Sequence, residues 1–104
     1  MNDRNVVAAM RRNAARATRM LKSIANEQRL LILCQLAAGE RSAGELGQGT
    51  GLAQSAVSQH LAVLRRNRLV STQREAQRVL YALRSEEVRA ILQCLHAVYC
   101  TTKL

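Results

Sequence analysis

Residues 51–69, GLAQSAVSQHLAVLRRNRL, are predicted to form an amphipathic helix around which the chain is organised. Val57, Leu61 and Leu64 recur at the i, i+4, i+7 spacing that puts apolar side chains on one helix face. Ala53 extends this stripe by one turn. The other face carries hydrogen-bonding side chains and no carboxylate: Gln54, Ser55, Ser58, Gln59 and His60. Such side chains can contact base edges or phosphates, so this face is a candidate DNA-binding surface.

A shorter helix is predicted directly before it. Ser42 has the position of an N-cap and Glu45 follows three residues later, which is the capping-box pattern. Residues 49–52, GTGL, supply a tight turn between the two helices. Residues 42–66 therefore have the length, the helix cap and the turn that are typical of a helix-turn-helix. The alternative is an amphipathic surface helix whose polar face is only solvated.

Composition and charge favour one small, helical, nucleic-acid-binding domain over residues 1–104. Hydrophobic residues make up 48% of the chain but aromatic ones only 2%, and Pro, Phe and Trp are absent, so the core must consist of aliphatic side chains. The formal net charge is +9, and all but two of the 16 basic residues are Arg, which pairs with phosphate in a bidentate fork. Arg65, Arg66 and Arg68 lie at the end of the amphipathic helix.

A basic chain can also bind anionic membranes, but no long apolar span or lipidation motif is present, and we expect no membrane partner. Three cysteines without a CxxC pair are typical of a reducing compartment, so we expect a cytoplasmic protein. A chain of 104 residues has a marginal core, and we expect a homodimer.

Two helices are predicted before the helix-turn-helix. Residues 5–24 keep a near-helical apolar period without a breaker and predict one long helix, preceded by a loose start at residues 1–4. Its thin, Ala-rich stripe suits a dimer contact, or else packing on its own domain. Asn26 caps a second helix over residues 27–38, which is apolar nearly all round and is therefore expected to be buried. Cys34 lies within it, and an inert core residue is the ordinary interpretation.

A hairpin and a last helix complete the chain. The β-prone runs 69–74 and 78–83 are joined by residues 75–77 and predict a hairpin. Its tip would form a basic wing, although exposed tips often carry solvated charges; the wing residues are Arg74, Gln77 and Arg78. Ser85 caps a helix whose apolar face is a second candidate dimer contact. Cys94 and Cys100 on this helix are separated by about 9 Å of rise and about 120° of rotation, too far for a mutual disulfide.

The predicted fold is mainly α with a β-hairpin wing, a winged helix-turn-helix. The stretches 26–30 (NEQRL), 51–61 (GLAQSAVSQHL) and 78–81 (RVLY) resemble the ArsR/SmtB family of winged-helix repressors. The resemblance covers nearly the whole chain. It implies a homodimer packed through the first and last helices, which releases a palindromic operator when an inducer binds.

The resemblance also bears on the inducer. Residues 41–46, RSAGEL, lack the paired cysteines of the family's metal-binding box, and His96 alone stands where the zinc pattern of the last helix is expected. Cys34 and Cys100 resemble the two cysteines of the sulfide-responsive BigR-like and SqrR-like branch, which form a disulfide or polysulfide bridge. Cys94 has no counterpart there. The resemblance thus implies that Cys34 and Cys100 are sensor thiols.

Four functions are compatible with these features. The first is a transcriptional repressor that binds double-stranded DNA and senses reactive sulfur species or oxidants. The second is the same repressor sensing a thiophilic metal ion through Cys34 and Cys100, with His96 as a further candidate ligand. A cysteine enzyme is disfavoured because no histidine or acid accompanies Cys34, and we expect neither catalytic residues nor a cofactor nor a resident metal. An architectural DNA protein is the fourth, and an operator-specific footprint would exclude it.

Among the predicted DNA-binding residues, three have a specific expected contact. Gln54 or Ser58 is expected to reach a base edge, and Arg78 a phosphate.

Overall fold

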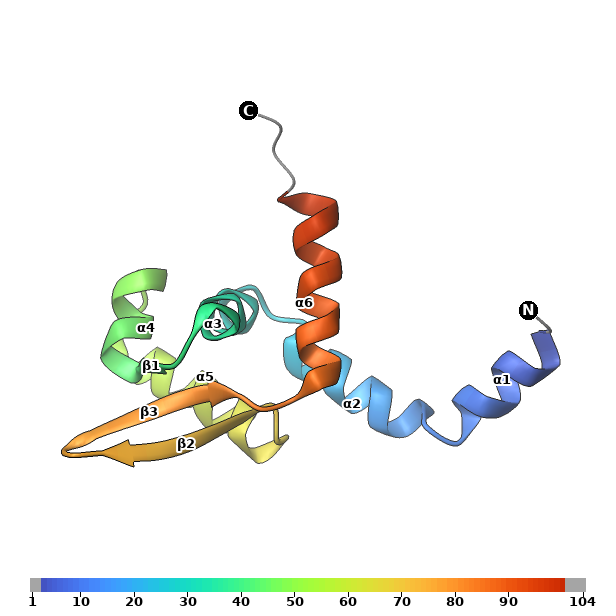
Figure 1. The fold of residues 1–104 in the computed structure, drawn as a ribbon, viewed down its shortest axis with the longest axis horizontal. Helices are drawn as coiled ribbons and strands as arrows, with labels where there is room; N and C mark the ends of the chain where they lie inside the picture. The colour runs from blue at the N-terminus through green and yellow to red at the C-terminus, as the bar shows by residue number, and fades with distance from the viewer. Residues whose placement is uncertain (1–2, 101–104) are drawn as a thin grey trace.

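The computed structural model describes residues 3–100, and within them the chain forms six helices and a three-stranded antiparallel sheet of order β1-β3-β2 (Figure 1). The elements are α1 (Asp3–Arg11), α2 (Ala14–Ile24), α3 (Glu27–Ala38), β1 (Arg41–Ser42), α4 (Ala43–Thr50), α5 (Gln54–Arg66), β2 (Val70–Glu75), β3 (Arg78–Leu83) and α6 (Glu86–Tyr99). The predicted class, mainly α with a β-hairpin wing, is confirmed.

The core lies beneath the helix-turn-helix. The predicted stripe of α5 is buried, with Val57, Leu61 and Leu64 at most 1% exposed. It packs against fully buried side chains from α3, α4, β2 and α6: Ile32, Leu33, Leu46, Val70 and Val88. Burying these apolar side chains fixes the rotation of α5 about its axis, so its polar face is held toward solvent.

The single long helix expected over residues 5–24 is wrong, because the chain breaks it at Asn13. The Asn13 side-chain amide donates to the Ala9 carbonyl at 3.2 Å, and its backbone N–H donates to the Met10 carbonyl at 2.8 Å. These bonds satisfy the last carbonyls of α1, and asparagine competes with the helical ladder in this way. The start expected to be loose is also helical from Asp3; residues 1 and 2 lie outside the described part.

The amphipathic helix is shorter than residues 51–69 at both ends. Gly51 has φ 77°, a left-handed conformation that ends α4, so residues 49 and 50 belong to α4 and not to the turn. Ala53 is the extended N-cap of α5 and is exposed, and it does not extend the apolar stripe. At the other end α5 stops at Arg66, and Arg68, with φ 64°, lies in the short turn before β2. The capping box of Ser42 and Glu45 is present as predicted.

The second predicted helix has the expected bounds but not the expected burial. Asn26 caps α3, with the Arg29 N–H donating to Asn26 Oδ1 at 3.0 Å. Ile32 and Leu33 are buried, whereas Leu31 is 46% exposed and Cys34 is exposed. The expectation of a helix buried all round is therefore wrong, as is the interpretation of Cys34 as a core residue. One face of α3 instead faces solvent in the single chain.

The wing contains a tighter turn and one more strand than predicted. Glu75 pairs with Arg78 in the β2–β3 register, so the turn consists of Ala76 and Gln77 alone. The third strand, β1, pairs with β3 through Arg41 and Ser42. Two residues are too few to show the alternation by which strands are predicted from sequence. Pairing on both sides fixes β3 as the central strand.

Replacing Ala76 by glycine is expected to raise the free energy of unfolding by roughly 0.5–1 kcal/mol. Ala76 has φ 57°, a left-handed backbone that is costly for a residue with a Cβ, whereas glycine adopts it freely. The midpoint of urea unfolding measures the change. Ala82→Gly, inside β3, is the control and should be destabilising; an Ala76→Gly variant no more stable than the unaltered protein would contradict the argument.

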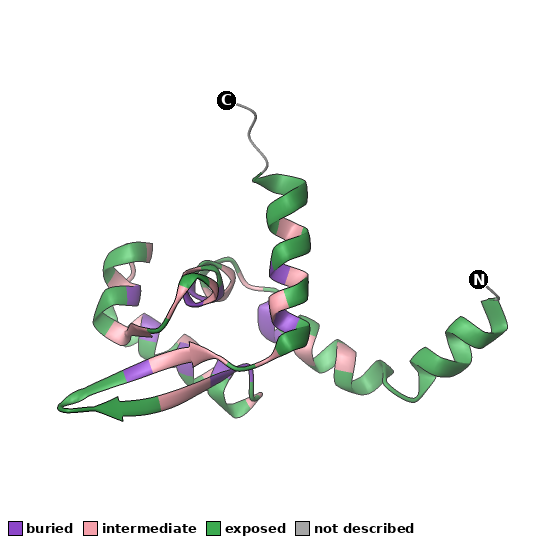
Figure 2. Cartoon of the chain, in the orientation of Figure 1, coloured by how far each residue is buried: buried purple, intermediate pink, exposed green. Residues whose placement is uncertain are grey.

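The N-terminal and C-terminal helices stand away from the winged core. The radius of gyration is 15.6 Å, against about 13 Å for a compact domain of 100 residues. Helix α1 buries no residue, and α6 extends upward from the core with an exposed end (Figures 1 and 2). Arg16 of α2 and Glu87 of α6 form an ion pair of 2.8 Å, but both side chains are more than half exposed and such a pair stabilises little. These helices leave apolar surface uncovered, including Met10, Leu21 and Tyr99.

Candidate DNA interface and thiol pair

The polar face of α5 is open to solvent. Of the five predicted residues, Gln54, Ser55, Ser58 and Gln59 are exposed and His60 is half-buried. Ser55, Gln59 and Arg66 follow one another at i, i+4 and i+11, so they share the stripe opposite the buried face. His60 lies on the flank of the helix instead. The structure therefore exposes four of the five predicted side chains on the polar face of α5, whereas His60 is half-buried and lies beside that face.

The N-terminal end of α5 is not closed by a side chain. Ala53, its N-cap, makes no side-chain cap bond, whereas Asn26, Ser42 and Ser85 cap α3, α4 and α6. Recognition helices contact base edges through their N-terminal residues. Gln54, exposed at the first position of α5, therefore has the best position for such a contact.

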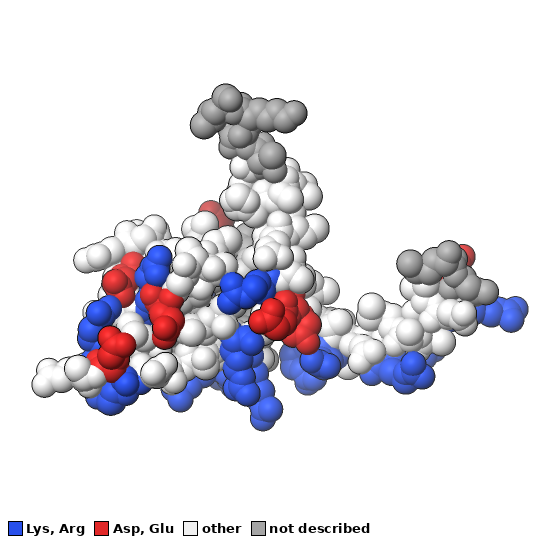
Figure 3. Space-filling model, viewed as in Figure 1, with Lys and Arg blue, Asp and Glu red and all other residues white. Residues whose placement is uncertain are grey.

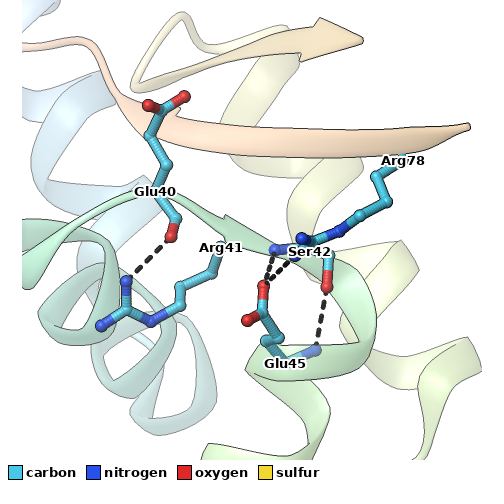
Figure 4. A network of polar contacts seen from close by, with 5 residues as sticks. All are labelled: Glu40, Arg41, Ser42, Glu45 and Arg78. Carbon is cyan, nitrogen blue, oxygen red and sulfur yellow. Dashed lines mark hydrogen bonds and ion pairs between the residues drawn. The ribbon is translucent and has the colours of Figure 1, made fainter. Parts of the chain in front are cut away.

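The wing residues do not all have the same surroundings. Arg74 and Gln77 are exposed near the tip. The Arg78 guanidinium instead donates to Glu45 Oε1 at 2.8 Å, and the same oxygen accepts the Ser42 N–H at 2.9 Å (Figure 4). This link joins β3 of the wing to α4. Arg78 stays a predicted phosphate contact, but its charge already has an acidic partner.

The surroundings of Glu45 keep it ionised. The backbone N–H of Ser42, its hydroxyl and the guanidinium of Arg78 all lower the pKa of the Glu45 carboxyl. The Ser42 hydroxyl also accepts the Glu45 N–H at 3.2 Å, which completes the capping box. The sequence signalled the capping box, but it held no signal that Arg78, 33 residues away, would join it.

Basic side chains gather along one edge of the molecule. In Figure 3 they run along the lower edge, from the wing to α1, while the upper part carries few. Basic side chains gathered along one edge attract a polyanion such as DNA and speed its association.

The two predicted sensor thiols lie on different helices. Cys34 lies on α3 and Cys100 is the C-cap of α6; both are exposed, as is Cys94. Neighbouring atoms that desolvate Cys34, together with the charge of Cys100, raise the pKa of the Cys34 thiol. The pairing of Cys34 with Cys100 as sensor thiols stays a prediction.

The described part of the chain holds neither a cluster of metal ligands nor a helix of membrane-spanning character. Within residues 3–100, no three or more His, Cys, Asp or Glu side chains group together as metal ligands. None of the helices in that range has the length and apolar character needed to span a bilayer.

The profile of the family described as "Bacterial regulatory protein, arsR family" matches residues 26–72. The transcriptional activator HlyU of Vibrio cholerae is 54% identical over 91 residues, covering 88% of this chain and 84% of HlyU. The chain belongs to the ArsR family of bacterial regulatory proteins. Because this family consists of DNA-binding transcriptional regulators, this ArsR-family chain is a transcriptional regulator and not an enzyme.

Solved structures of ArsR-family proteins share the fold. Reduced HlyU from V. cholerae has a TM-score of 0.84 at 53% identity, over 89% of this chain and 98% of that one. The transcriptional repressor BigR from Xylella fastidiosa has a TM-score of 0.85 at 32% identity, over 91% and 97%. A homodimeric winged helix-turn-helix domain from Mycobacterium bovis has a TM-score of 0.74 at 30% identity, over 94% and 86%. The resemblance to this family drawn from the sequence is confirmed.

Proposed function

We propose that this protein is a homodimeric transcriptional repressor that releases a palindromic operator when reactive sulfur species or oxidants link Cys34 to Cys100. HlyU is named an activator and BigR a repressor, so the direction of regulation is part of the proposal. The observation that carries it is the exposure of Cys34 on α3 and of Cys100 at the end of α6, together with the raised pKa of the Cys34 thiol, to which burial contributes most and Cys100 contributes second. An inert core cysteine would be buried, whereas Cys34 is exposed.

The chemistry needs one oxidising sulfur compound. A thiolate attacks a sulfur atom of an inorganic polysulfide, and the shorter polysulfide leaves with the bonding electrons, giving a protein persulfide. The second thiolate then attacks the inner sulfur and expels hydrosulfide, giving a disulfide. If both cysteines carry persulfides, the terminal sulfur of one attacks the inner sulfur of the other and expels hydrosulfide, leaving a trisulfide. In each case the two thiols lose two electrons and two protons, and sulfane sulfur is reduced.

A link between these residues can be transmitted to the DNA-binding surface. Helix α3 packs against α4, α5 and α6, so it connects α6 to the helix-turn-helix. Tying Cys34 to Cys100 fixes the end of α6 against α3. If α6 belongs to the dimer contact, the distance between the two copies of α5 changes, and a palindrome tolerates little misplacement.

The dimer itself is supported by the exposed apolar surface of the N-terminal and C-terminal helices. A nine-residue helix such as α1, with no buried residue, is too short to be stable on its own. The extended shape and the homodimeric M. bovis domain point the same way. A second copy of this chain would cover α1 and α6 together.

The direct test compares reduced and polysulfide-treated protein on DNA selected by the protein itself. Reduced protein should bind, and treated protein should be released and gain the mass of a disulfide or of added sulfur atoms. If cadmium or zinc releases the protein from DNA and the protein mass shows no covalent change of the thiols, a thiophilic metal ion is favoured as the inducer instead. Release by neither would contradict the proposal.

Gln54→Ala is expected to weaken operator binding by about 1–3 kcal/mol and to leave binding to random DNA nearly unchanged. The reason is that Gln54 is exposed at the first position of α5. Fluorescence anisotropy with the two duplexes measures both affinities. Gln93→Ala, an exposed glutamine of α6, is the matched control. Equal losses on the two duplexes would show that Gln54 only holds the backbone.

Alkylation of Cys34 should have a pH midpoint above the ordinary thiol value, because its pKa is raised by desolvation and by Cys100. In a Cys94→Ser background, the midpoint should move down when Cys100→Ser is added, since the neighbouring negative charge is gone. The pH dependence of iodoacetamide modification, followed by peptide mass, measures both midpoints. Coincident midpoints would show that the two thiols do not interact.

A further inference from the structure

An open hollow of about 460 Å³ lies between α5 and the wing. Five of its lining residues are spaced at i, i+3, i+4, i+7 and i+8 and so form a single stripe of α5, and the sixth comes from β3: Ser58, Leu61, Ala62, Arg65, Arg66 and Tyr81. A water molecule takes up about 30 Å³, so the hollow holds the volume of roughly fifteen waters.

The polar groups of this hollow are all donors that suit one chemical class. Arg65 and Arg66 contribute guanidinium groups, and Ser58 and Tyr81 contribute hydroxyls. No carboxylate lines it. Within residues 3–100 neither Arg65 nor Arg66 forms an ion pair with a carboxylate. The ligand that these groups fit is an oxyanion, above all a phosphate.

The hollow is held rigidly. Leu61 is 1% exposed and anchors the α5 side to the core. Tyr81 lies on the central strand, opposite Thr72 of β2 on one side and Arg41 of β1 on the other, and it packs against the core. Within the described residues the Tyr81 hydroxyl makes no hydrogen bond to protein. Its ring is therefore fixed while its donor stays available, which is the preorganisation that a binding site needs.

We propose that Ser58, Arg65, Arg66 and Tyr81 form a seat for one backbone phosphate of DNA. The inference rests on DNA binding through α5. If α5 lies in the major groove and the wing lies beside it, the sugar-phosphate strand bordering that groove passes between them, where the hollow is. Ser58 then contacts the backbone, whereas the sequence grouped it with base-contacting residues. Tyr81, which the sequence offered only as a strand residue, becomes a positioning residue that fixes the register of α5 on the duplex.

Tyr81→Phe tests the seat because it removes only the hydroxyl. Affinity should fall about tenfold on operator and on random duplex alike, with an unchanged salt slope, since no charge is lost. Arg65→Gln should instead lower the salt slope by about one. The other tyrosine of the chain provides the matched control, Tyr99→Phe, on the exposed end of α6. Unchanged thermal unfolding shows that Tyr81→Phe is folded, and Ser58→Ala, at the surface, repeats the test.

A duplex series locates the phosphate. One methylphosphonate, which carries no charge, is placed at successive positions of a half-site, and the loss caused by Tyr81→Phe should vanish at one position. A loss that persists at every position overturns the seat. If free phosphate at constant ionic strength competes with DNA binding but no methylphosphonate position abolishes the effect of Tyr81→Phe, the hollow is a site for free anions. That result would also overturn the seat. If the protein prefers its operator to random duplex but Tyr81→Phe leaves DNA affinity unchanged, the seat alone is refuted. If Tyr81→Phe lowers DNA affinity but the protein shows no preference for any sequence, the operator-binding function is refuted and the seat is kept.

Discussion

Cys34→Ser and Cys100→Ser proteins should each stay on the operator after polysulfide treatment, whereas Cys94→Ser protein should be released like the unaltered one. A bridge needs both sulfur atoms, and a single remaining thiol can carry a persulfide but cannot tie α3 to α6. Cys34 and Cys100 are both exposed, and Cys100 contributes to the raised pKa of the Cys34 thiol. Serine preserves the size of each side chain, so the reduced proteins should bind equally well.

Anisotropy of labelled operator, before and after treatment and again after a thiol reductant, measures this result. The bridged form should bind at least about tenfold more weakly, and reductant should restore binding. The Cys94→Ser protein is the control for modification of an exposed cysteine. Release of the Cys34→Ser/Cys100→Ser double variant as readily as the unaltered protein would refute the thiol pair and leave the regulator intact.

Leu95→Glu is expected to dissociate the dimer and weaken operator binding at least about 100-fold. Leu95 is only half-buried in the single chain, and Val98 and Tyr99 beyond it are 67% and 79% exposed. A carboxylate at a face that packs against a second copy would be desolvated without a partner. A palindrome is bound by paired half-sites, so loss of the dimer removes most of the affinity.

Sedimentation velocity at micromolar concentration measures the assembly, and anisotropy measures the binding. Gln93→Glu adds the same charge to an exposed position of α6 and should leave the dimer intact. A stable monomer of the unaltered protein that still binds its operator tightly would overturn the proposed architecture.

Local signals predicted most of the fold. The caps at Asn26, Ser42 and Ser85 are where the sequence placed them, because each depends on residues only three positions apart. The buried stripe of α5 followed from its period. The break at Asn13 was missed because the Ala- and Arg-rich residues around it favour a helix. In the structure the Asn13 side-chain amide donates to the Ala9 carbonyl at the end of α1.

Contacts between distant segments could not be predicted. The two-residue β1 exists only because β3 pairs with it, and the Arg78–Glu45 bond depends on the wing folding back toward α4. The apolar composition of α3 predicted burial all round. Which of its faces is buried depends on the elements that pack against it in three dimensions, and one face is left exposed. The proposed pairing of Cys34 with Cys100 rests on the family resemblance, since their spacing in the sequence says nothing about it.

The separation of α1 from the winged core has a consequence for gene duplication. Helix α1 buries no side chain, and no residue of the α5 face or the wing belongs to it. In the proposed dimer, in which α1 contacts the second copy, substitutions along α1 are therefore expected to change which copy a protomer pairs with and to leave the operator sequence unchanged. On this proposal, two gene duplicates in one cell could stop pairing with each other before their DNA targets diverge, because different stretches of the chain would determine partner choice and target choice.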